Sequence, residues 1–554
     1  MRKRIPYSNL LLIFAAIILS MLFSLSSLFF PLSNRIDFND SAIYQYIGHL
    51  ICEGGVPYVD AFDHKGIYFY FINSLGYLIS PKWGMWPLIC ICMFCNILII
   101  YHIARRFLNK SYSVIITILI ASAMSCSTWD GDTPDSFAVL FNLIAFDMIS
   151  EYFVNSKLSR KKIFIAGITS AVAFWMKLNM ITGTLVLCGC LILYFLIKKQ
   201  ISLVNRCLAF FTLGFCIATL PGIIWLGKKG ALAAMVEDYF LFNFSYASFN
   251  ATFSSQLSAF STFIGYPIGI MTLGCILTFL ITLLGKTNEK ITTKNNGMIC
   301  CGSVSYVACL IHASMTGNSY PQYMMLMYPS IVLILVGCIW NFNNIWKKKK
   351  NVSIVIMLAA LVVISLNAWN ERAYCVYFWS EVPQEQEEVD FISNNTAYGD
   401  TIASVSPYNS GLYIATNRES ATKYVYVQAN HYVNMSEFPE IEKSFWEEYT
   451  DLLIDSRPRM IIYDTGFLGN DNEIKTILNR CLNRYFYAGA SATKEFYVLP
   501  YSEEEEIPEF VSEIEVDTSL MSLDIPEEMI ECYKNGEITL DEFLKLFDQE
   551  WNKR

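Results

Sequence analysis

Apolar runs of about 20 residues recur through the first two thirds of this 554-residue chain. A helix needs roughly 20 apolar residues to cross a hydrocarbon core ~30 Å thick. The first run, residues 8–30, follows the basic sequence MRKR without a convincing small-residue cleavage site, so we expect an uncleaved first span. Ten further spans are predicted at residues 85–104, 113–128, 134–154, 162–177, 180–197, 207–226, 258–285, 297–316, 322–341 and 352–370.

The distribution of basic residues predicts how these spans are oriented. The predicted inner segments hold 20 Lys and Arg residues, whereas the short outer loops hold six. Cytoplasmic loops of membrane proteins carry such an excess, so the N-terminus is expected to be cytoplasmic. An odd number of spans then places the chain after residue 371 outside a cell membrane.

The last third of the chain has a different composition. Residues 371–554 carry 36 acidic and 14 basic side chains. Strand-like runs (DTIASVS, RMIIYDT, EFYVLP) alternate there with helical ones (KSFWEEYTDLLIDS, NEIKTILNRCLNR), which indicates a small α/β domain. We therefore expect a transmembrane domain over residues 1–371, an extracytoplasmic α/β domain over 372–502 and an acidic tail over 503–554.

Acidic residues are scarce in the membrane part and are unevenly placed. Of the thirteen in residues 1–370, ten fall on the predicted outer side. Eight of these lie in two loops, as Asp37, Asp40, Glu53, Asp60 and Asp63 in the first and Asp130, Asp132 and Asp135 in the second. A solvated rim predicts scatter, whereas clustering on one face indicates a catalytic or ion-binding cavity.

The first outer loop begins with a predicted helix and ends in the charged stretch YVDAFDHKG. Ile43, Ile47 and Leu50 have helical spacing, with Asp40 at or near the N-cap and a Gly54-Gly55 stop. We expect an amphipathic helix at the membrane surface that holds Asp40 at the water–lipid boundary. A plain N-cap role for Asp40 is the alternative.

Glycosyl transfer from a lipid-phosphate sugar suits such residues. The acceptor hydroxyl needs a carboxylate base within hydrogen-bond reach, and the leaving phosphate needs positive charge or hydrogen-bond donors. Lys65, His64 and Lys177 are candidates for the phosphate, although Lys177 also fits a lysine that extends to the interface. No residue set has convincing metal spacing, and most of the 17 cysteines lie inside predicted spans as apolar filler.

The stretch DFNDSAIYQYIGHLICEGGVPYVDAFDHKGIYFYFINSLG resembles the first outer loop of the C-type (GT-C) glycosyltransferase superfamily. The likeness is to bacterial relatives of the dolichyl-phosphate-mannose protein mannosyltransferases and of the lipid A aminoarabinose transferase. By this resemblance Asp40 takes the position of the catalytic base, and His64 and Lys65 take the phosphate-binding positions. Tyr58, Asp60 and Asp63 would line the substrate pocket.

Two later stretches resemble the same family more weakly. WDGDTPDSFAVLF makes Asp135 or Asp132 the second functional carboxylate. The stretch GNSYPQYMMLMYP would place Tyr320 and Gln322 near the phosphate, with Gln322 where a histidine often stands. The proline expected after DHK is replaced by Gly66-Ile67. The resemblance implies a GT-C fold, a polyprenyl-phosphate sugar donor and inversion at the anomeric carbon. We expect no cofactor.

The same resemblance implies partners. They are a polyprenyl-phosphate sugar donor, an acceptor glycan, lipid or protein, and membrane lipid, with no nucleic acid. Two other functions stay open. A surface-polysaccharide polymerase or ligase with a lipid-diphosphate donor usually has a large late outer loop, which is short here. A transporter or flippase should place ionisable groups near mid-membrane, where these spans have almost none.

Overall fold

The computed structural model describes most of the chain up to residue 508. The described residues are 7–33, 40–128, 131–244, 251–284, 293–345, 358–366, 369, 385–406, 410–427, 439–468, 472–491, 493–502 and 507–508. Residues 1–508 form one compact unit, separate from residues 509–554. The predicted boundary near residue 371 and almost all of the acidic tail lie outside the described residues, so the predicted domain division stays a prediction.

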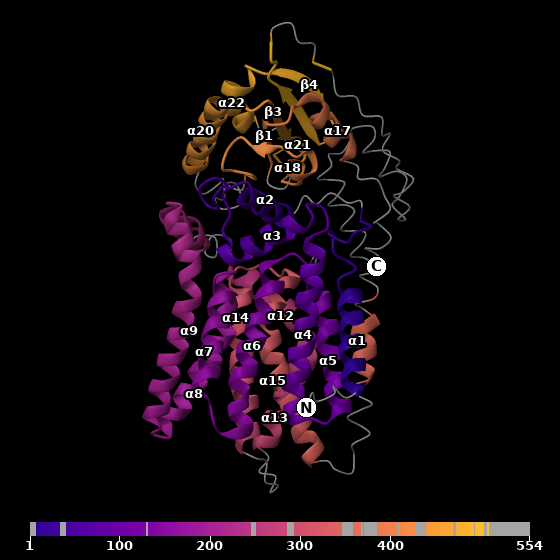
Figure 1. Cartoon of the computed structure of the whole chain (residues 1–554), viewed down its shortest axis with the longest axis vertical. Helices are drawn as coiled ribbons and strands as arrows, with labels where there is room; N and C mark the ends of the chain where they lie inside the picture. Colours follow the sequence, from indigo (N-terminus) through magenta and orange to yellow (C-terminus); the bar gives the residue numbers. More distant parts are fainter. Residues whose placement is uncertain are drawn as a thin grey trace, which may run out of the picture. The chain divides into compact units, whose positions relative to one another are not determined.

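Long apolar helices make up most of the first 345 residues (Figure 1). They are α1 (Tyr7–Phe23), α4 (Met85–Phe107), α5 (Lys110–Cys126), α6 (Pro134–Asn155), α7 (Arg160–Phe174), α8 (Thr182–Ile197), α9 (Ile201–Lys228), α12 (Phe253–Gly265), α13 (Pro267–Leu284), α14 (Thr293–Ser314) and α15 (Tyr328–Ile345). Shorter helical segments join them at η1 (Leu178–Ile181), α10 (Leu232–Met235), η2 (Val236–Leu241) and η3 (Pro321–Leu326).

Within the described residues, five helices are long and apolar enough to cross a membrane, and a bent pair makes a sixth candidate. Other apolar helices, such as Lys110–Cys126 and Tyr328–Asn341, are shorter. A helix lies at each span predicted between residues 85 and 341, although the count of eleven spans is not established. Of the last predicted span, only residues 358–366 and 369 are described.

Two predicted spans differ from the structure. The run 258–285 is not one straight helix, because α12 and α13 meet at an angle of 85°. Pro267 has no N–H to donate and disfavours a helical conformation at Tyr266, whose ψ is 141°. The first helix ends at Phe23 rather than at residue 30, and the serine-rich chain after it forms turns in which Ser24 Oγ donates to Ser20 O at 2.8 Å.

Two helices of the first outer loop lie between the bundle and the β-sheet (Figure 1). These are α2 (Asp40–Cys52) and α3 (Ile67–Ile79). The predicted helix at α2 is present, but residues 41–48 are all buried, so the exposed polar face expected of a surface helix is absent from it. One side of α2 packs on α3, and the other packs on α18 (Gly411–Thr416), where Tyr46 and Tyr413 rings lie 5.3 Å apart.

The strands predicted in the last third are present in a five-stranded sheet of order β2-β1-β3-β5-β4. Its elements are α17 (Gln386–Asn395), β1 (Thr401–Val405), α18, β2 (Glu419–Ser420), α20 (Pro439–Ser456), β3 (Met460–Asp464), α21 (Thr465–Leu468), α22 (Asn472–Leu482), β4 (Phe486–Ala490) and β5 (Lys494–Val498). Strand β1 is parallel to β2 and β3, whereas β5 is antiparallel to β3 and β4.

Helices cover both faces of this sheet. Trp446 and Leu453 of α20 and Leu478 of α22 pack with Tyr463 of β3 in one buried cluster. On the opposite face, the ring of Phe391 of α17 lies 5.1 Å from that of Phe496 of β5. Because β3 is buried along its whole length, its first four residues (MIIY) form a continuous apolar run rather than an alternating pattern.

Candidate functional site

The charged loop before α3 is held in one shape by its own hydrogen bonds. The Asp60 carboxylate accepts from Val56 N–H at 2.7 Å, and Tyr58 N–H donates to Ala61 O at 2.8 Å. Tyr58 has a φ of 72°, and its buried hydroxyl donates to Lys65 O at 2.7 Å. The exposed Asp60 therefore closes the turn, and Tyr58 fixes the backbone at Lys65.

Asp63 lies at the centre of this loop and is 1 % exposed. Its two oxygens accept hydrogen bonds from two tyrosines, Oδ2 from Tyr70 at 2.7 Å and Oδ1 from Tyr426 at 3.0 Å. Burial alone would raise the pKa of Asp63, but the positive charge of Lys65 and the hydrogen bond from Tyr70 hold that pKa below its usual value. Asp63 is therefore an ionised, oriented anion inside the loop.

His64 and Lys65, which the sequence predicts to bind phosphate together, differ in charge in the structure. Lys65 Nζ lies 2.7 Å from His64 Nε2 and 3.8 Å from Asp63 Oδ1. Burial and the neighbouring charge of Lys65 lower the pKa of His64 to about 3, so its imidazole is neutral at physiological pH. Lys65 carries the positive charge, and His64 holds the lysine ammonium in place.

Gly66 brings a second lysine to the same site. The Gly66 N–H donates to Met176 O at 3.0 Å, so the loop runs directly against the chain that leaves α7. A β-carbon at Gly66 would overlap the carbonyl group of Trp175 and lie 2.9 Å from Met176 N. Only glycine fits this contact, and a proline would also lack the donated N–H. Lys177 follows immediately after this contact.

Lys177 pairs with a carboxylate of the second outer loop. Its Nζ lies 2.7 Å from Asp135 Oδ2 and 4.5 Å from the ring centroid of Tyr323. Asp135 is fixed in the first turn of α6, where Thr133 caps the helix by accepting from Ser136 N–H at 3.2 Å. Lys177 is only 18 % exposed, so it is an ion-paired residue of the site rather than a lysine that extends to the interface.

Asp132 lies on the same loop but faces α3. It is fully buried, and Asn73 Nδ2 lies 3.5 Å from its Oδ1. Gly131 precedes it with a φ of 87°, a left-handed conformation that suits glycine. This contact favours a structural role for Asp132 in joining the second outer loop to α3.

Asp40 is the first residue of α2 and is exposed. Its Oδ2 accepts a hydrogen bond from Tyr44 OH, one helical turn later, at 3.2 Å. Lys65 Nζ lies 5.5 Å from the Tyr44 ring centroid. Burial raises the pKa of Tyr44 well above its usual value, and four nearby carboxylates raise it further: Asp40, Asp63, Asp135 and Asp132. The buried Tyr44 therefore lies among the carboxylates of both outer loops.

The two candidates near η3 differ in exposure. Tyr320 is 48 % exposed and packs edge-on against Tyr323, with ring centroids 5.6 Å apart. Gln322 Oε1 is buried and has no hydrogen-bond partner among the described residues. Because Tyr323 contacts Lys177, η3 borders the site, and Gln322 offers an uncharged amide there.

Several residues of the site were not predicted. Tyr44 lies four residues after Asp40, so the predicted helix already placed the two residues on the same face. Asn243 Nδ2 donates to His64 O at 2.8 Å, and Asp238, whose pKa burial raises to about 7, lies on the same segment. Tyr426 is 363 residues from Asp63 in the sequence and carries no motif that singles it out.

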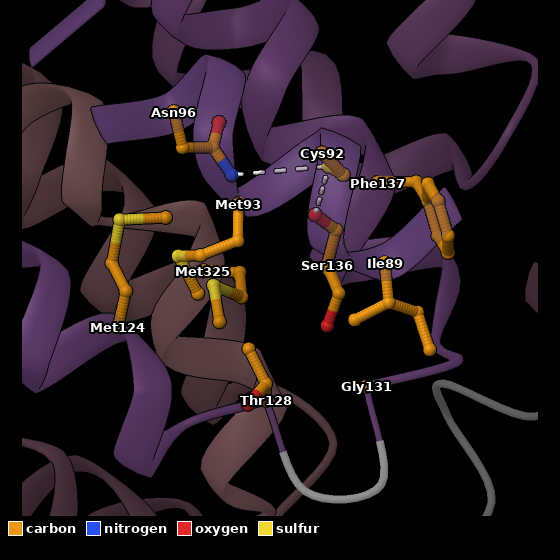
Figure 2. Close-up of a pocket in the computed structure, with 10 residues that line it drawn as sticks. All are labelled: Ile89, Cys92, Met93, Asn96, Met124, Thr128, Gly131, Ser136, Phe137 and Met325. Atoms are coloured by element: carbon orange, nitrogen blue, oxygen red, sulfur yellow. Dashed lines mark hydrogen bonds between the residues drawn. The ribbon is translucent and has the colours of Figure 1, made fainter. Parts of the chain in front are cut away.

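A small, mostly apolar cavity lies next to the second outer loop, whose residues Thr128 and Gly131 line it (Figure 2). Its walls come from α4, α5, α6 and η3, and three methionines face it: Met93, Met124 and Met325. Asn96 Nδ2 lies 3.8 Å from Cys92 Sγ, and Cys92 Sγ lies 3.3 Å from Ser136 O. The second contact ties α4 to the first turn of α6, which carries Asp135.

The sequence was compared with protein-family profiles and with curated proteins. Residues 2–351 match the family profile described as the putative competence-induced protein Ccs4 N-terminal domain. A comparison with curated proteins finds no match.

Comparison with solved structures identifies the fold of this chain. The crystal structure of ArnT from Cupriavidus metallidurans bound to undecaprenyl phosphate matches 90 % of this chain and 99 % of that chain, with a TM-score of 0.58 and 12 % identity. Its apo state matches 88 % and 98 %, with a TM-score of 0.57 and 12 % identity. The archaeal oligosaccharyltransferase AglB from Archaeoglobus fulgidus, in complex with an inhibitory peptide and a dolichol-phosphate, matches 89 % and 75 %, with a TM-score of 0.47 and 12 % identity. The chain therefore has the expected GT-C fold and is a multi-pass membrane protein.

Proposed function

This chain belongs to the family of the putative competence-induced protein Ccs4 N-terminal domain, and we propose that it is a membrane glycosyltransferase. The proposed reaction moves a sugar from a polyprenyl-phosphate donor to a hydroxyl group of an acceptor glycan, lipid or protein. The observation that carries this proposal is the convergence of two poorly exposed lysines, Lys65 and Lys177, from separate loops. The contact between Gly66 and Trp175 joins those loops.

Two lysines at one site suit a lipid phosphate. ArnT, which shares the fold, was crystallised with undecaprenyl phosphate. In this chain Lys65 and Lys177 would bind the phosphate oxygens, with the Gln322 amide beside them. Each lysine already lies near a carboxylate, Asp63 or Asp135, so the two positive charges are compensated without a ligand. A bound phosphate would share the lysines with these carboxylates.

Asp40 fits the general base better than the other carboxylates. Asp135 is committed to Lys177 at 2.7 Å, and Asp132 contacts Asn73. Asp40 is exposed, and among the described residues its one hydrogen-bond partner is the Tyr44 hydroxyl, so an acceptor can reach it. In the proposed step Asp40 takes the proton of the acceptor hydroxyl.

The rest of the step follows from that proton transfer. The acceptor oxygen forms a bond to the anomeric carbon while the bond from that carbon to the phosphate oxygen breaks. Both electrons of the broken bond stay on the phosphate, and Lys65 and Lys177 stabilise the added charge. Attack opposite to the departing phosphate inverts the anomeric configuration, and free polyprenyl phosphate is the second product.

The excess of Lys and Arg in the predicted inner loops supports an outer-face reaction in the cell membrane. In that orientation the N-terminus is cytoplasmic. The segment 372–502 and the site then face the outside, where the acceptor would be met.

The test is a panel of polyprenyl-phosphate sugars offered to the purified full chain in lipid nanodiscs. We expect one donor to be consumed with release of polyprenyl phosphate, and consumption to stop in the double variant Lys65→Ala/Lys177→Ala. Consumption of a lipid-diphosphate donor instead would favour a polymerase or ligase. Movement of lipid across the membrane without bond cleavage would favour a flippase.

A further inference from the structure

Residues 420–427 belong to the part of the chain that holds the β-sheet (the α/β part), and they lie directly against α2 and the charged loop of the membrane part. Phe62 N–H donates to Lys423 O at 2.7 Å, and Ser420 N–H donates to the Tyr46 hydroxyl at 2.8 Å. The Phe62 ring lies 5.9 Å from the ring of Tyr426. Backbone, side-chain and ring contacts thus join two stretches more than 350 residues apart.

The sheet holds this segment in turn. Val427 N–H donates to Ser406 O at 2.9 Å, at the end of β1, and Ser410 Oγ donates to Val425 O at 3.3 Å. Val425, Tyr426 and Val427 are all buried. The backbone that carries Tyr426 is therefore anchored to the sheet part as well as to the charged loop.

That hydroxyl acts on the oxygen of Asp63 that faces Lys65. Tyr426 OH donates to Asp63 Oδ1 at 3.0 Å, and Lys65 Nζ lies 3.8 Å from the same oxygen. The lysine separation is too long for a hydrogen bond, unlike the 2.7 Å between Lys177 and Asp135. With its oxygen occupied by the tyrosine, Asp63 attracts Lys65 without binding it directly.

We propose that Tyr426 is a positioning residue for the phosphate-binding lysine, so that the α/β part completes the site of the membrane part. Tyr426 satisfies Asp63 Oδ1 and keeps Lys65 available to a phosphate. Without the hydroxyl, Asp63 draws the ammonium toward itself, because a buried carboxylate oxygen that loses a donor takes another. This inference rests on the proposed function for the identity of the ligand, but not for the contact between the two parts.

The experiment uses the full chain in nanodiscs with undecaprenyl phosphate as the probe. Tyr426→Phe removes only the hydroxyl. Tyr449→Phe is the matched control, because Tyr449 is fully buried in the same α/β core and its hydroxyl has no hydrogen-bond partner among the described residues. Two further variants, Asp63→Asn and Asp63→Asn/Tyr426→Phe, complete a double-mutant cycle.

We expect Tyr426→Phe to weaken undecaprenyl phosphate binding by about tenfold to a hundredfold, the range set by the net strength of one hydrogen bond to a charged group. Tyr449→Phe should bind as the wild type does. Adding Tyr426→Phe to Asp63→Asn should change nothing further, because the Asp63 charge on which the tyrosine acts is gone. A general loss of packing would weaken binding equally in both backgrounds, and that result would overturn the proposal.

Hydrogen exchange of residues 62–66 supplies a readout that needs no ligand. Exchange should rise in Tyr426→Phe and stay unchanged in Tyr449→Phe. Unchanged exchange in Tyr426→Phe would overturn the positioning role even if the proposed function were correct. Wild-type protein that binds no undecaprenyl phosphate would instead contradict the proposed function, and the exchange data would still decide whether Tyr426 positions the loop.

Discussion

Substituting Gly66 with alanine tests how the two lysines are brought together. The added methyl group would overlap the Trp175 carbonyl and lie 2.9 Å from Met176 N, and all of these atoms belong to backbone. Backbone cannot rotate away, so the two segments must separate by on the order of 1 Å to restore ordinary van der Waals contact. Lys65 and Lys177 flank this contact and must separate with it.

A displacement of about 1 Å at a reacting centre can cost on the order of 100-fold in rate. We therefore expect Gly66→Ala to lower kcat/KM for the consumed polyprenyl-phosphate sugar by about that factor, with undecaprenyl phosphate binding weakened as well. Gly189→Ala is the control, because a β-carbon there meets nothing within 4 Å. Folded Gly66→Ala protein with wild-type kcat/KM would refute the claim that this contact sets the spacing of the lysines.

Three more predictions concern Lys65, the protonation of His64 and the orientation of the chain in the membrane. Lys65→Ala should lose about 2–4 kcal/mol of transition-state stabilisation, measured from kcat/KM, and Lys65→Arg should regain part of that loss. Equal turnover in the wild type and in Lys65→Ala would contradict the phosphate role. His64 has a pKa lowered to about 3, so the unfolded chain binds a proton that the folded chain rejects, and stability should fall as pH drops from about 6.5 toward 3, by at most ~1.4 kcal/mol per pH unit. Thermal unfolding of His64→Gln should show a smaller loss over that range, and an identical pH dependence would count against this assignment. Cysteine labelling should reach residues 198–206 only from the cytoplasm and residues 400–500 only from outside, and labelling of the latter from the cytoplasm would overturn the orientation.

The helices were predictable because each span is defined by local composition. The break at Pro267 was present in the sequence, but an unbroken apolar run on both sides of it concealed the bend. The bounds of α2 followed from Asp40 and the glycines after it, whereas its burial did not. On one side α2 is buried by α18, hundreds of residues away, and no local pattern predicts such a contact.

The paired lysines and carboxylates of the candidate site were predictable from the sequence, whereas the contacts between them were not. Lys65 and Asp63 were recognisable within one short motif, and Lys177 and Asp135 were identified separately. Their pairing depends on the approach of α7 to α6 and was not predictable from either segment alone. The neutral state of His64 depends on its burial beside Lys65, which composition does not reveal.

The most direct test of the central claim is a single-turnover measurement on enzyme preloaded with the consumed donor. Asp40→Asn keeps the shape and capping ability of the side chain, so folding and undecaprenyl phosphate binding should survive. Release of polyprenyl phosphate on adding acceptor should slow by about 10²–10⁴-fold, because the proton acceptor is lost. Near-normal release in Asp40→Asn, with release abolished and donor binding intact in Asp135→Asn, would contradict the account and move the base to the second outer loop.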